Sequence, residues 1–233
     1  MRPSKKIKER FVLYLKEMRT ELAGDPGSLG LIRALEQRLE GREGGNSFKI
    51  GADGSEGAKG LDFPLPPEIV DEKSFALFSD GACRGNPGPG AWASFGQDFR
   101  GSVFFEASGV EINTTNNRME MEAAAQAFEA LGSYCQGDAE RPSPEEVRVF
   151  LYSDSKYLVD GMNRWIKGWK LKGWRKKDGG APENLDLWKN LDRLVERFKA
   201  VGFHWVKGHG GHPQNEYCDR LANKALDESG YFI

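Results

Sequence analysis

The pattern of apolar and polar residues divides this chain of 233 residues into three parts. In the first part, residues 5–22 and 31–39 carry large apolar side chains at three- and four-residue spacing, which predicts two amphipathic helices. Gly24, Pro26 and Gly27 separate them, so we expect a helical extension at residues 1–40. A weakly ordered tail is the alternative, because isolated helices of this length are only marginally stable in water.

The second part is expected at residues 41–70. As far as Asp62 it is rich in glycine and nearly free of large apolar side chains apart from Phe48 and Ile50, which is typical of a flexible linker. The basic, amphipathic start of the chain resembles an organelle-targeting peptide only superficially. Glu9, Glu17 and Glu21 argue against that interpretation, because such peptides are poor in acidic residues. We therefore expect an extension and a linker ahead of a domain at residues 71–233.

The third part has the pattern of a sheet with helices. SFALFSD, GAWASF and GSVFFEA are short apolar runs between turn-rich segments, which predicts an antiparallel meander. VRVFLYSD and VGFHWV predict two further strands, and helices are expected at about 117–131, up to 168, and at about 184–200 and 215–226. The order of elements indicates an α/β fold with a mixed five-stranded sheet and helices packed on its faces.

Composition narrows the functional classes only a little. No run of eighteen apolar residues offers a membrane span, so we expect no membrane partner. The net charge of -2 argues against a chain that coats nucleic acid throughout, but a balanced total can conceal a basic patch. The 3 cysteines lack the spacing of a disulfide framework and no secretory signal pattern opens the chain, so reduced thiols and a cytoplasmic location are expected.

Four acidic residues stand at the boundaries of the predicted elements or in the last helix: Asp80, Glu120, Asp154 and Asp219. Taken singly, each could be a turn residue, a helix cap or a solvent-facing acid. Strand ends and helix starts in such a sheet converge at one edge, however, and converging carboxylates repel one another unless cations lie between them. Their hard oxygen atoms favour Mg²⁺ or Mn²⁺, and two such ions suit phosphoryl transfer.

The segment GACRGNPGPG after Asp80 contains four glycines and two prolines, which would let the backbone approach a sugar-phosphate chain. With TTNNRMEMEAA, LYSDSKYLVDG and HWVKGHGGHPQNEYCDRLA it resembles, in order and spacing, the motifs of type 1 ribonuclease H. The resemblance covers about residues 74–228 and implies a ribonuclease H-like fold. It implies an endoribonuclease that uses two Mg²⁺ ions, or Mn²⁺ as a substitute, to hydrolyse the RNA strand of RNA–DNA hybrids. The products would carry 5′-phosphate and 3′-hydroxyl ends.

The same resemblance implies roles for individual residues. The metal ligands are Asp80, Glu120, Asp154 and Asp219, and His209 matches a mobile loop histidine that helps a proton move or a product leave. A zinc site of His204, His209 and His212 is the alternative for that segment. The family also implies a monomer that acts in genome maintenance, including DNA replication.

Contacts to the hybrid are implied for Cys83, through its backbone, and for Asn86, Thr115, Asn116 and Asn117. Thr115 and Asn86 match a pocket for a DNA phosphate. Some family members place an arginine just before the threonine pair, where this chain has Asn113, so the pocket is weaker unless another basic residue supplies the charge.

Residues 161–177 contain seven basic side chains, no acidic ones and three tryptophans. They resemble the family's basic protrusion, which implies that the DNA strand is gripped by Trp165, Lys167, Trp169, Lys170 and Lys172. A solvated basic face with tryptophans in the core is the alternative.

Three questions stay open at this point. A binding module that recognises hybrids without cutting them would share most of these motifs. A transposase, an integrase or a Holliday-junction resolvase would share the fold. The extension at residues 1–70 resembles nothing in the family, and our hypothesis is that it docks on a protein partner or on the catalytic domain.

Overall fold

The computed structural model describes Tyr14, residues 47–50 and residues 63–229, and the chain divides into one unit at 1–46 and another at 47–233. Tyr14 is an exposed helical residue. The rest of the expected helical extension lies outside the described residues. All elements discussed below belong to the second unit.

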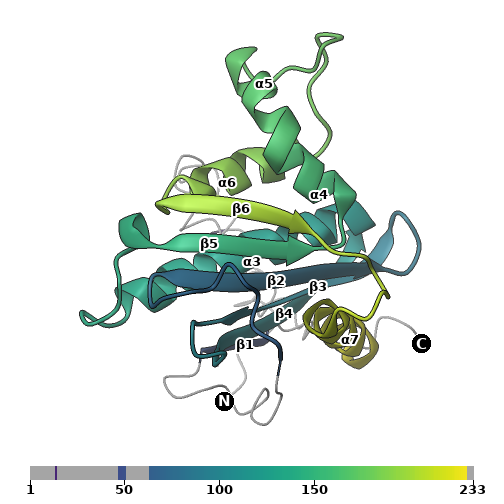
Figure 1. Ribbon diagram of the computed structural model, residues 1–233. Helices are drawn as coiled ribbons and strands as arrows, with labels where there is room; N and C mark the ends of the chain where they lie inside the picture. The colour runs from purple at the N-terminus through teal and green to yellow at the C-terminus, as the bar shows by residue number, and fades with distance from the viewer. Residues whose placement is uncertain (1–13, 15–46, 51–62, 230–233) are drawn as a thin grey trace. The chain divides into compact units, whose positions relative to one another are not determined.

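The second unit is built on one mixed sheet with the strand order β1-β4-β3-β2-β5-β6 (Figure 1). Its strands are β1 (Ser47–Ile50), β2 (Ser74–Cys83), β3 (Gly88–Gln97), β4 (Val103–Thr114), β5 (Arg148–Ser153) and β6 (Ala200–Trp205). β2, β3 and β4 form the predicted antiparallel meander, while β5 runs parallel to both β2 and β6. β2 to β6 are the five predicted strands. β1 adds a sixth by pairing with β4, although it falls within the stretch expected to be a linker.

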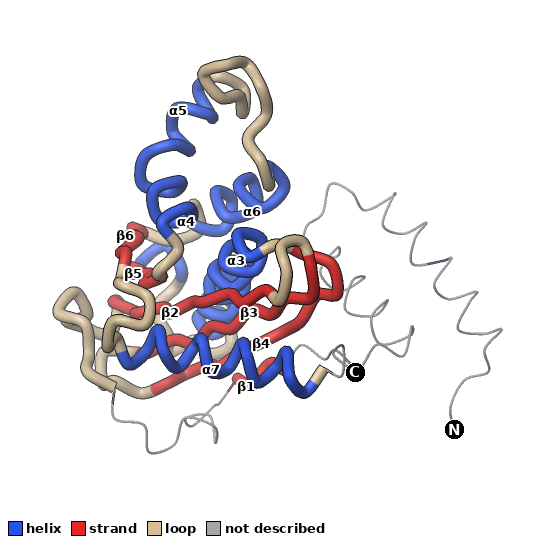
Figure 2. Tube along the Cα trace, turned by 90° about the vertical axis from the view of Figure 1, so that its right-hand side faces the viewer, coloured by secondary structure: helices blue, strands red, loops and turns tan. Residues whose placement is uncertain are grey.

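The helices are, in chain order, α3 (Asn116–Gln136), a 3-10 turn (Pro144–Glu146), α4 (Lys156–Asp160), a π-helical turn (Gly161–Trp165), α5 (Ile166–Leu171), α6 (Leu185–Val195) and α7 (Pro213–Glu228). α3 and α6 cover one face of the sheet and α7 lies on the other (Figures 1 and 2). Within the described ranges, no helix combines the length and the apolar character that a membrane span requires.

Alternation along β2 explains how one strand serves both layers. Phe75 and Leu77 join the core formed with α3 and α6, whereas Phe78 faces the opposite layer together with Cys218 of α7. Both faces of the central strands are therefore covered, which agrees with the continuous apolar run VRVFLYS that includes β5.

Two helices differ in length from the expectation. α3 continues past Leu131 to Gln136 because Tyr134 packs against Phe104 at a ring distance of 4.5 Å and Cys135 is buried. α6 ends at Val195, well before residue 200. The chain turns there, and the backbone nitrogen of Lys199 donates to the carbonyl oxygen of Val147 as β6 enters the sheet.

The segment from α4 to α5 forms a nearly continuous helical run, and α5 with the loop after it projects beyond the β6 edge of the sheet (Figure 1). The run is anchored against α6. A Cβ atom on Gly161 would lie 2.0 Å from the Trp188 ring, so only glycine permits this close packing. The ring of Trp169 lies 5.5 Å from that of Trp188.

Residues 63–69 pack on the sheet face that α7 covers. The Phe63 ring stacks on Phe95 at 5.3 Å and contacts Tyr217 of α7 at 5.4 Å. Gln214, also in α7, donates a side-chain hydrogen bond to the carbonyl oxygen of Pro64. Side chains that belong to the folded unit therefore begin at least as early as Phe63.

Candidate active site

Asp80 and Asp154 are brought together by the parallel pairing of β2 and β5. Phe78 is the register partner of Tyr152, so two further residues along each strand lead to Asp80 and to Asp154. Both acids thus lie just beyond the last parallel pair of β2 and β5, at the edge at which ligands bind in open α/β sheets. β2 itself does not end at Asp80 as the sequence predicted, because its antiparallel pairing with β3 continues to Cys83.

Glu120 reaches this edge because α3 packs very closely on β2. A Cβ atom on Gly81 would lie 2.4 Å from the backbone nitrogen of Glu120, so only glycine allows the approach. Thr115 is the N-cap of α3 and its hydroxyl accepts a hydrogen bond from the backbone nitrogen of Arg118. Glu120 is therefore not needed for a capping box with Asn117, and its carboxylate is available to the site.

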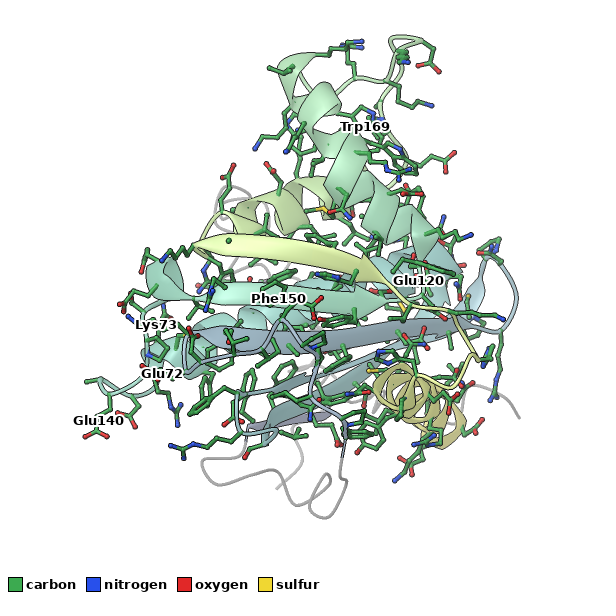
Figure 3. All side chains as sticks on the ribbon, viewed as in Figure 1. Glu72, Lys73, Glu120, Glu140, Phe150 and Trp169 are labelled. Carbon is green, nitrogen blue, oxygen red and sulfur yellow. The ribbon has the colours of Figure 1, made fainter. Side chains whose placement is uncertain are left out.

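Hydrogen bonds from two different helices hold the Glu120 carboxylate. Asn116 Nδ2 donates to Oε1 at 2.7 Å from one turn earlier in α3, and the hydroxyl of Ser155, the N-cap of α4, donates to Oε2. Burial raises the pKa of Glu120 to about 7, and the charge of Asp154 adds to the shift against these hydrogen bonds. Figure 3 marks Glu120 at the edge where β5 and β6 end.

Asp80 is the most strongly perturbed acid of the four. Its side chain is almost enclosed, and Oδ1 accepts a hydrogen bond of 2.7 Å from the backbone nitrogen of Gly81. Burial raises the pKa of Asp80 to about 8, with the negative charge of Asp154 as the second cause and smaller contributions from Asp219 and Glu120. The four carboxylates therefore act on one another.

Asp154 is held from its own strand end and from the loop after β6. Burial raises its pKa, while a hydrogen bond from Asn215 and the nearby His209 oppose the shift and Asp219 adds to it. Trp205 Nε1 donates to the backbone oxygen of Asp154 at 3.0 Å. A Cβ atom on Gly208 would lie 2.3 Å from Asp154 Oδ2, so the loop can approach this closely only with glycine.

Asp219 lies half-buried on α7, where its Oδ1 accepts a hydrogen bond of 2.7 Å from Asn223. In the ranges that the structure describes, no group of three or more His, Cys, Asp or Glu side chains lies close enough together to hold a metal ion. The four acids are thus near enough to influence one another's charge, but they are not arranged as a closed ligand shell.

The three histidines of the last motif have separate surroundings. His209 is exposed in the loop, with a φ angle of 48°. His204 stacks on Tyr152 at a ring distance of 4.9 Å, and its Nδ1 lies 3.7 Å from a carboxylate oxygen of Glu68. His212 packs against Phe78, and burial lowers its pKa. Of these three histidines, His209 is the one whose charge acts on Asp154.

Comparison with known proteins shows to which family the chain belongs. The family model described as RNase H matches residues 72–227. The chain belongs to the ribonuclease H family. Curated relatives named Ribonuclease H from Agrobacterium fabrum and Rhizobium meliloti are 46% and 45% identical over 155 residues, which make up 66% of this chain and 96% and 92% of those proteins. The protein is thus a ribonuclease H enzyme.

Solved structures of this ribonuclease H family share the fold. LC9-RNase H1, described as a type 1 RNase H with the type 2 active-site motif, is 33% identical with a TM-score of 0.55, and the match covers 73% of this chain and 81% of that one. LC11-RNase H1 in complex with RNA/DNA hybrid is 24% identical with a TM-score of 0.51, covering 66% and 98%, and supports the fold alone.

The structure places five of the expected hybrid contacts of this ribonuclease H side by side. Cys83 is the last residue of β2 and Asn86 lies in the turn between β2 and β3, where its Oδ1 accepts a hydrogen bond of 3.4 Å from the backbone nitrogen of Asn116. The Cys83 thiol donates to the carbonyl oxygen of Gly85 at 2.7 Å, so its side chain is used within the turn. Thr115, Asn116 and Asn117 form the adjoining start of α3.

The expected contacts in the protruding segment, residues 161–177, fall into two groups. Lys167 and Lys172 are exposed and make no ion pair with the described part of the chain, and Trp165 is 36% exposed. Lys170 instead lies 2.8 Å from Asp192 and 2.7 Å from Glu196, and Trp169 packs on the core (Figure 3). The last two therefore hold the segment against α6.

Sequence reasoning missed two residues that orient the carboxylates, Ser155 and Asn215. Asn215 lies one turn before Asp219 on the same helix, so helical spacing already placed it on the same face. Ser155 directly follows Asp154 and caps α4. Its contact with Glu120 joins residues far apart in the chain, and no local pattern indicates such a contact.

Proposed function

We propose that this ribonuclease H hydrolyses the RNA strand of RNA–DNA hybrids with two Mg²⁺ ions, or Mn²⁺ in their place, and leaves 5′-phosphate and 3′-hydroxyl ends. The observation that carries the proposal is the convergence of four carboxylates: burial raises the pKa of Asp80 to about 8, and the charges of Asp154, Asp219 and Glu120 add to the shift. Among the described residues, no lysine or arginine forms an ion pair with any of the four. Such a site favours cations from solution.

The donor set fits hard divalent cations, because every candidate ligand is a carboxylate oxygen. Two bound ions would supply the positive charge that activates a water and stabilises the leaving oxygen in phosphodiester hydrolysis. Asp80 and Asp154 would be the central ligands, with Asp80 shared. Glu120 would also meet the RNA ribose, and Asp219 would complete the second set of ligands.

Recognition of the hybrid would be divided between two surfaces. The amide groups of Asn86, Asn116 and Asn117 both donate and accept, which suits ribose 2′-hydroxyls and base edges in the minor groove. Thr115 and the exposed lysines of the protruding segment would contact phosphates of the DNA strand, which supplies affinity without sequence information. A pure RNA duplex or a pure DNA duplex would satisfy only one surface.

His209 would move a proton or assist release of the product. It is exposed on a loop and lies near enough to Asp154 to influence that residue's charge. In the cell, the activity would serve genome maintenance and DNA replication in the cytoplasm. The predicted protein partner of the extension would be tested by deleting residues 1–46 and comparing partner binding, processivity and stability.

The deciding experiment is hydrolysis of a hybrid labelled on either strand, with Mg²⁺ or Mn²⁺, beside single-stranded RNA, RNA duplex and DNA duplex. We expect cleavage of the hybrid's RNA strand alone and loss of it in Asp154→Asn. Asp71→Asn is the matched control, because Asp71 pairs with Arg148 at the opposite end of β5. Labelled-end analysis checks for the 5′-phosphate.

Other outcomes would assign other functions. Binding of the hybrid without cleavage under either ion would make the protein a hybrid-binding module. Cleavage of DNA strands or branched junctions would favour another nuclease of this fold. Cleavage that persists in a chelator, or in Asp154→Asn, would remove the carboxylates from the proposed mechanism.

A further inference from the structure

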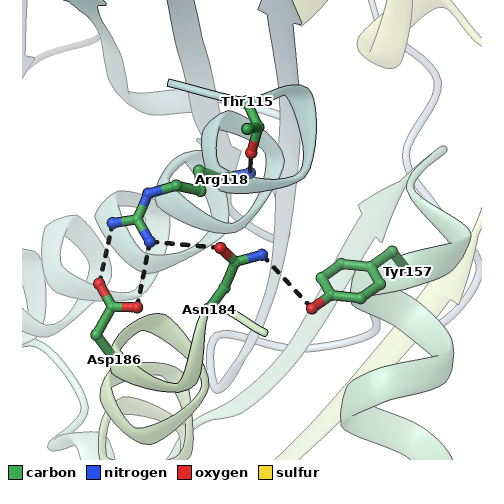
Figure 4. A network of polar contacts seen from close by, with 5 residues as sticks. All are labelled: Thr115, Arg118, Tyr157, Asn184 and Asp186. Carbon is green, nitrogen blue, oxygen red and sulfur yellow. Dashed lines mark hydrogen bonds and ion pairs between the residues drawn. The ribbon is translucent and has the colours of Figure 1, made fainter. Parts of the chain in front are cut away.

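Arg118 lies in the first turn of α3, two residues before Glu120, and its guanidinium faces the start of α6 (Figure 4). Nη1 donates to Asp186 Oδ1 at 3.2 Å and Nη2 donates to Oδ2 at 2.9 Å. This is the bidentate geometry that gives an Arg–carboxylate pair both strength and a fixed orientation. The planar guanidinium therefore fixes the direction of approach between the two helices.

A third bond extends the contact into a network. Arg118 Nη1 also donates to Asn184 Oδ1 at 3.4 Å, and Asn184 Nδ2 lies 3.5 Å from the hydroxyl of Tyr157 in α4. The same hydroxyl accepts from Trp188 Nε1 at 3.2 Å. Asn184 has a φ angle of 55°, and a non-glycine residue stays in this left-handed region only where its surroundings hold it.

The network leads back to the carboxylate site through α4. Tyr157 is two residues after Ser155, whose hydroxyl donates to Glu120. The Glu120 carboxylate is thus held once from α3, by Asn116, and once from α4, by Ser155. Each of these helices is separately tied to the start of α6, α3 through Arg118 and α4 through Tyr157.

We propose that Arg118, through its bidentate pair with Asp186, is a positioning residue that sets the angle between α3 and α4 and thereby orients Glu120 toward the divalent cations. The inference rests on the proposed two-metal function. Arg118 touches neither the cations nor the reacting atoms. Without the pair, Asn116 and Ser155 can still donate to Glu120. However, α3 is then no longer fixed to the start of α6, so its orientation relative to α4 is no longer set.

A competing role for Arg118 is to supply the charge that Asn113 does not bring to the DNA phosphate pocket. The geometry disfavours it, because both carboxylate oxygens of Asp186 already accept from the guanidinium. A phosphate contact would change hybrid affinity and its dependence on salt. A positioning role would change the affinity for the cation.

The chain offers a matched control in a second contact between the same two helices. About three turns further along α3, Glu129 pairs at 3.5 Å with Arg193 in the last turn of α6 and at 3.1 Å with Arg197, two residues after that helix ends. Breaking this contact loosens the helix pair without touching the network at Glu120. A merely structural role for Arg118 would therefore give Arg118→Gln and Glu129→Gln the same consequences.

The experiment measures Mg²⁺ binding by calorimetry in the absence of hybrid, beside KM, kcat and the Mg²⁺ concentration for half-maximal cleavage. We expect Arg118→Gln and Asp186→Asn to weaken Mg²⁺ binding about tenfold, the usual size of effect for groups that orient metal ligands. KM for the hybrid should stay within about twofold at saturating Mg²⁺. Arg118→Lys should fall between, because an ammonium cannot reproduce the bidentate pair.

Glu129→Gln should lower the melting temperature about as much as Arg118→Gln and leave Mg²⁺ affinity unchanged. Equal Mg²⁺ affinity in all variants would overturn the inference, and so would an equal loss in Glu129→Gln. A raised KM with a shallower salt dependence in Arg118→Gln would assign Arg118 to the phosphate instead. If Arg118→Gln does not fold, Arg118→Lys carries the same comparison. Failure of the wild-type enzyme to cleave hybrids would defeat the proposed function itself.

Discussion

Asp80 and Glu120 are 7% and 9% exposed, whereas Trp165 is 36% exposed and Lys167 and Lys172 lie open to solvent. At the carboxylate edge, like charges are buried together and each is held by named hydrogen bonds. In the protruding segment, like charges stand apart in water, where they repel one another weakly. Each region carries charges of a single sign, but the repulsion between them lowers the stability of the fold far more at the buried carboxylate edge than in the exposed segment.

The difference separates the tasks of the two regions. A buried carboxylate cluster is destabilising until cations arrive, so it combines strong attraction for metal with fixed geometry. Exposed lysines cost the fold little and act on a phosphate backbone through long-range, salt-screened attraction. Substitutions at the carboxylate edge should therefore change the rate and the stability, while substitutions in the protruding segment should change affinity.

The largest expected effect is on the rate, in Asp80→Asn. Removing a shared ligand forfeits several kcal/mol of transition-state stabilisation, so we expect kcat to fall by about a thousandfold or more. Asparagine keeps the size of the side chain and can still accept the hydrogen bond from Gly81. Single-turnover cleavage assays measure this fall in rate, and circular dichroism checks that the variant is folded. A loss below tenfold would mean that Asp80 is no central ligand.

The same substitution should stabilise the metal-free protein at high pH. The pKa of Asp80 rises from 3.8 to about 8 in the folded state, so between these values the folded chain holds a proton that the unfolded chain has lost. Stability of the wild type therefore falls as the pH rises through that window. We expect Asp80→Asn to be more stable by roughly 3 kcal/mol at pH 9 and nearly equal at pH 4.

Urea unfolding of both proteins in a chelator, repeated across this pH range, provides the measurement. Mg²⁺ should narrow the difference at high pH, because bound cations relieve the repulsion in the wild type. Parallel stability curves for the two proteins would show that the Asp80 carboxylate is not destabilising, and the contrast between the two regions would then lose its energetic basis.

Much of the fold and the positions of the four acids followed from the sequence alone. The shared edge of Asp80 and Asp154 is readable because parallel pairing brings the carboxyl ends of neighbouring strands together, although β2 continues past Asp80 to Cys83. The extent of the folded unit was not readable. Phe63 and Glu68 lie in a short proline-rich stretch without periodicity, and only the structure shows Phe63 stacked on Phe95 and Glu68 accepting from Tyr152.

The protruding segment shows a second limit of sequence reasoning. Composition marks it as basic and aromatic, but it does not say which side chains face the protein. Lys170 and Trp169 resemble Lys167 and Trp165 in sequence, yet the first two contact α6 and the core. The partners that decide this, Asp192 and Trp188, come from a different helix, so the division depends on tertiary packing.

Trp165 and Trp169 allow the contrast between a stabilising role and a substrate-binding role to be tested within the protruding segment. Trp169→Ala removes a half-buried ring from the Trp188 contact and should lower the free energy of unfolding by about 2 kcal/mol. Trp165→Ala should lower it by less than about 1 kcal/mol, because that ring is more exposed. Hybrid affinity should fall more in Trp165→Ala than in Trp169→Ala, because the Trp165 ring is the more accessible to the substrate. Denaturant unfolding and hybrid titration of both variants measure these effects, and equal destabilisation would contradict the division.

The smallest expected effect concerns the lysines. Lys167→Ala and Lys172→Ala should each weaken hybrid binding several-fold and reduce the slope of log affinity against log salt by about one. Lys170→Ala should change that slope less, because Asp192 and Glu196 already neutralise its ammonium. Titrations at several salt concentrations measure the slopes. Equal slopes for all three would mean that Lys170 leaves Asp192 and Glu196 and binds a phosphate when the hybrid binds. The same lysine would then anchor α5 in the free protein and contact the substrate in the complex.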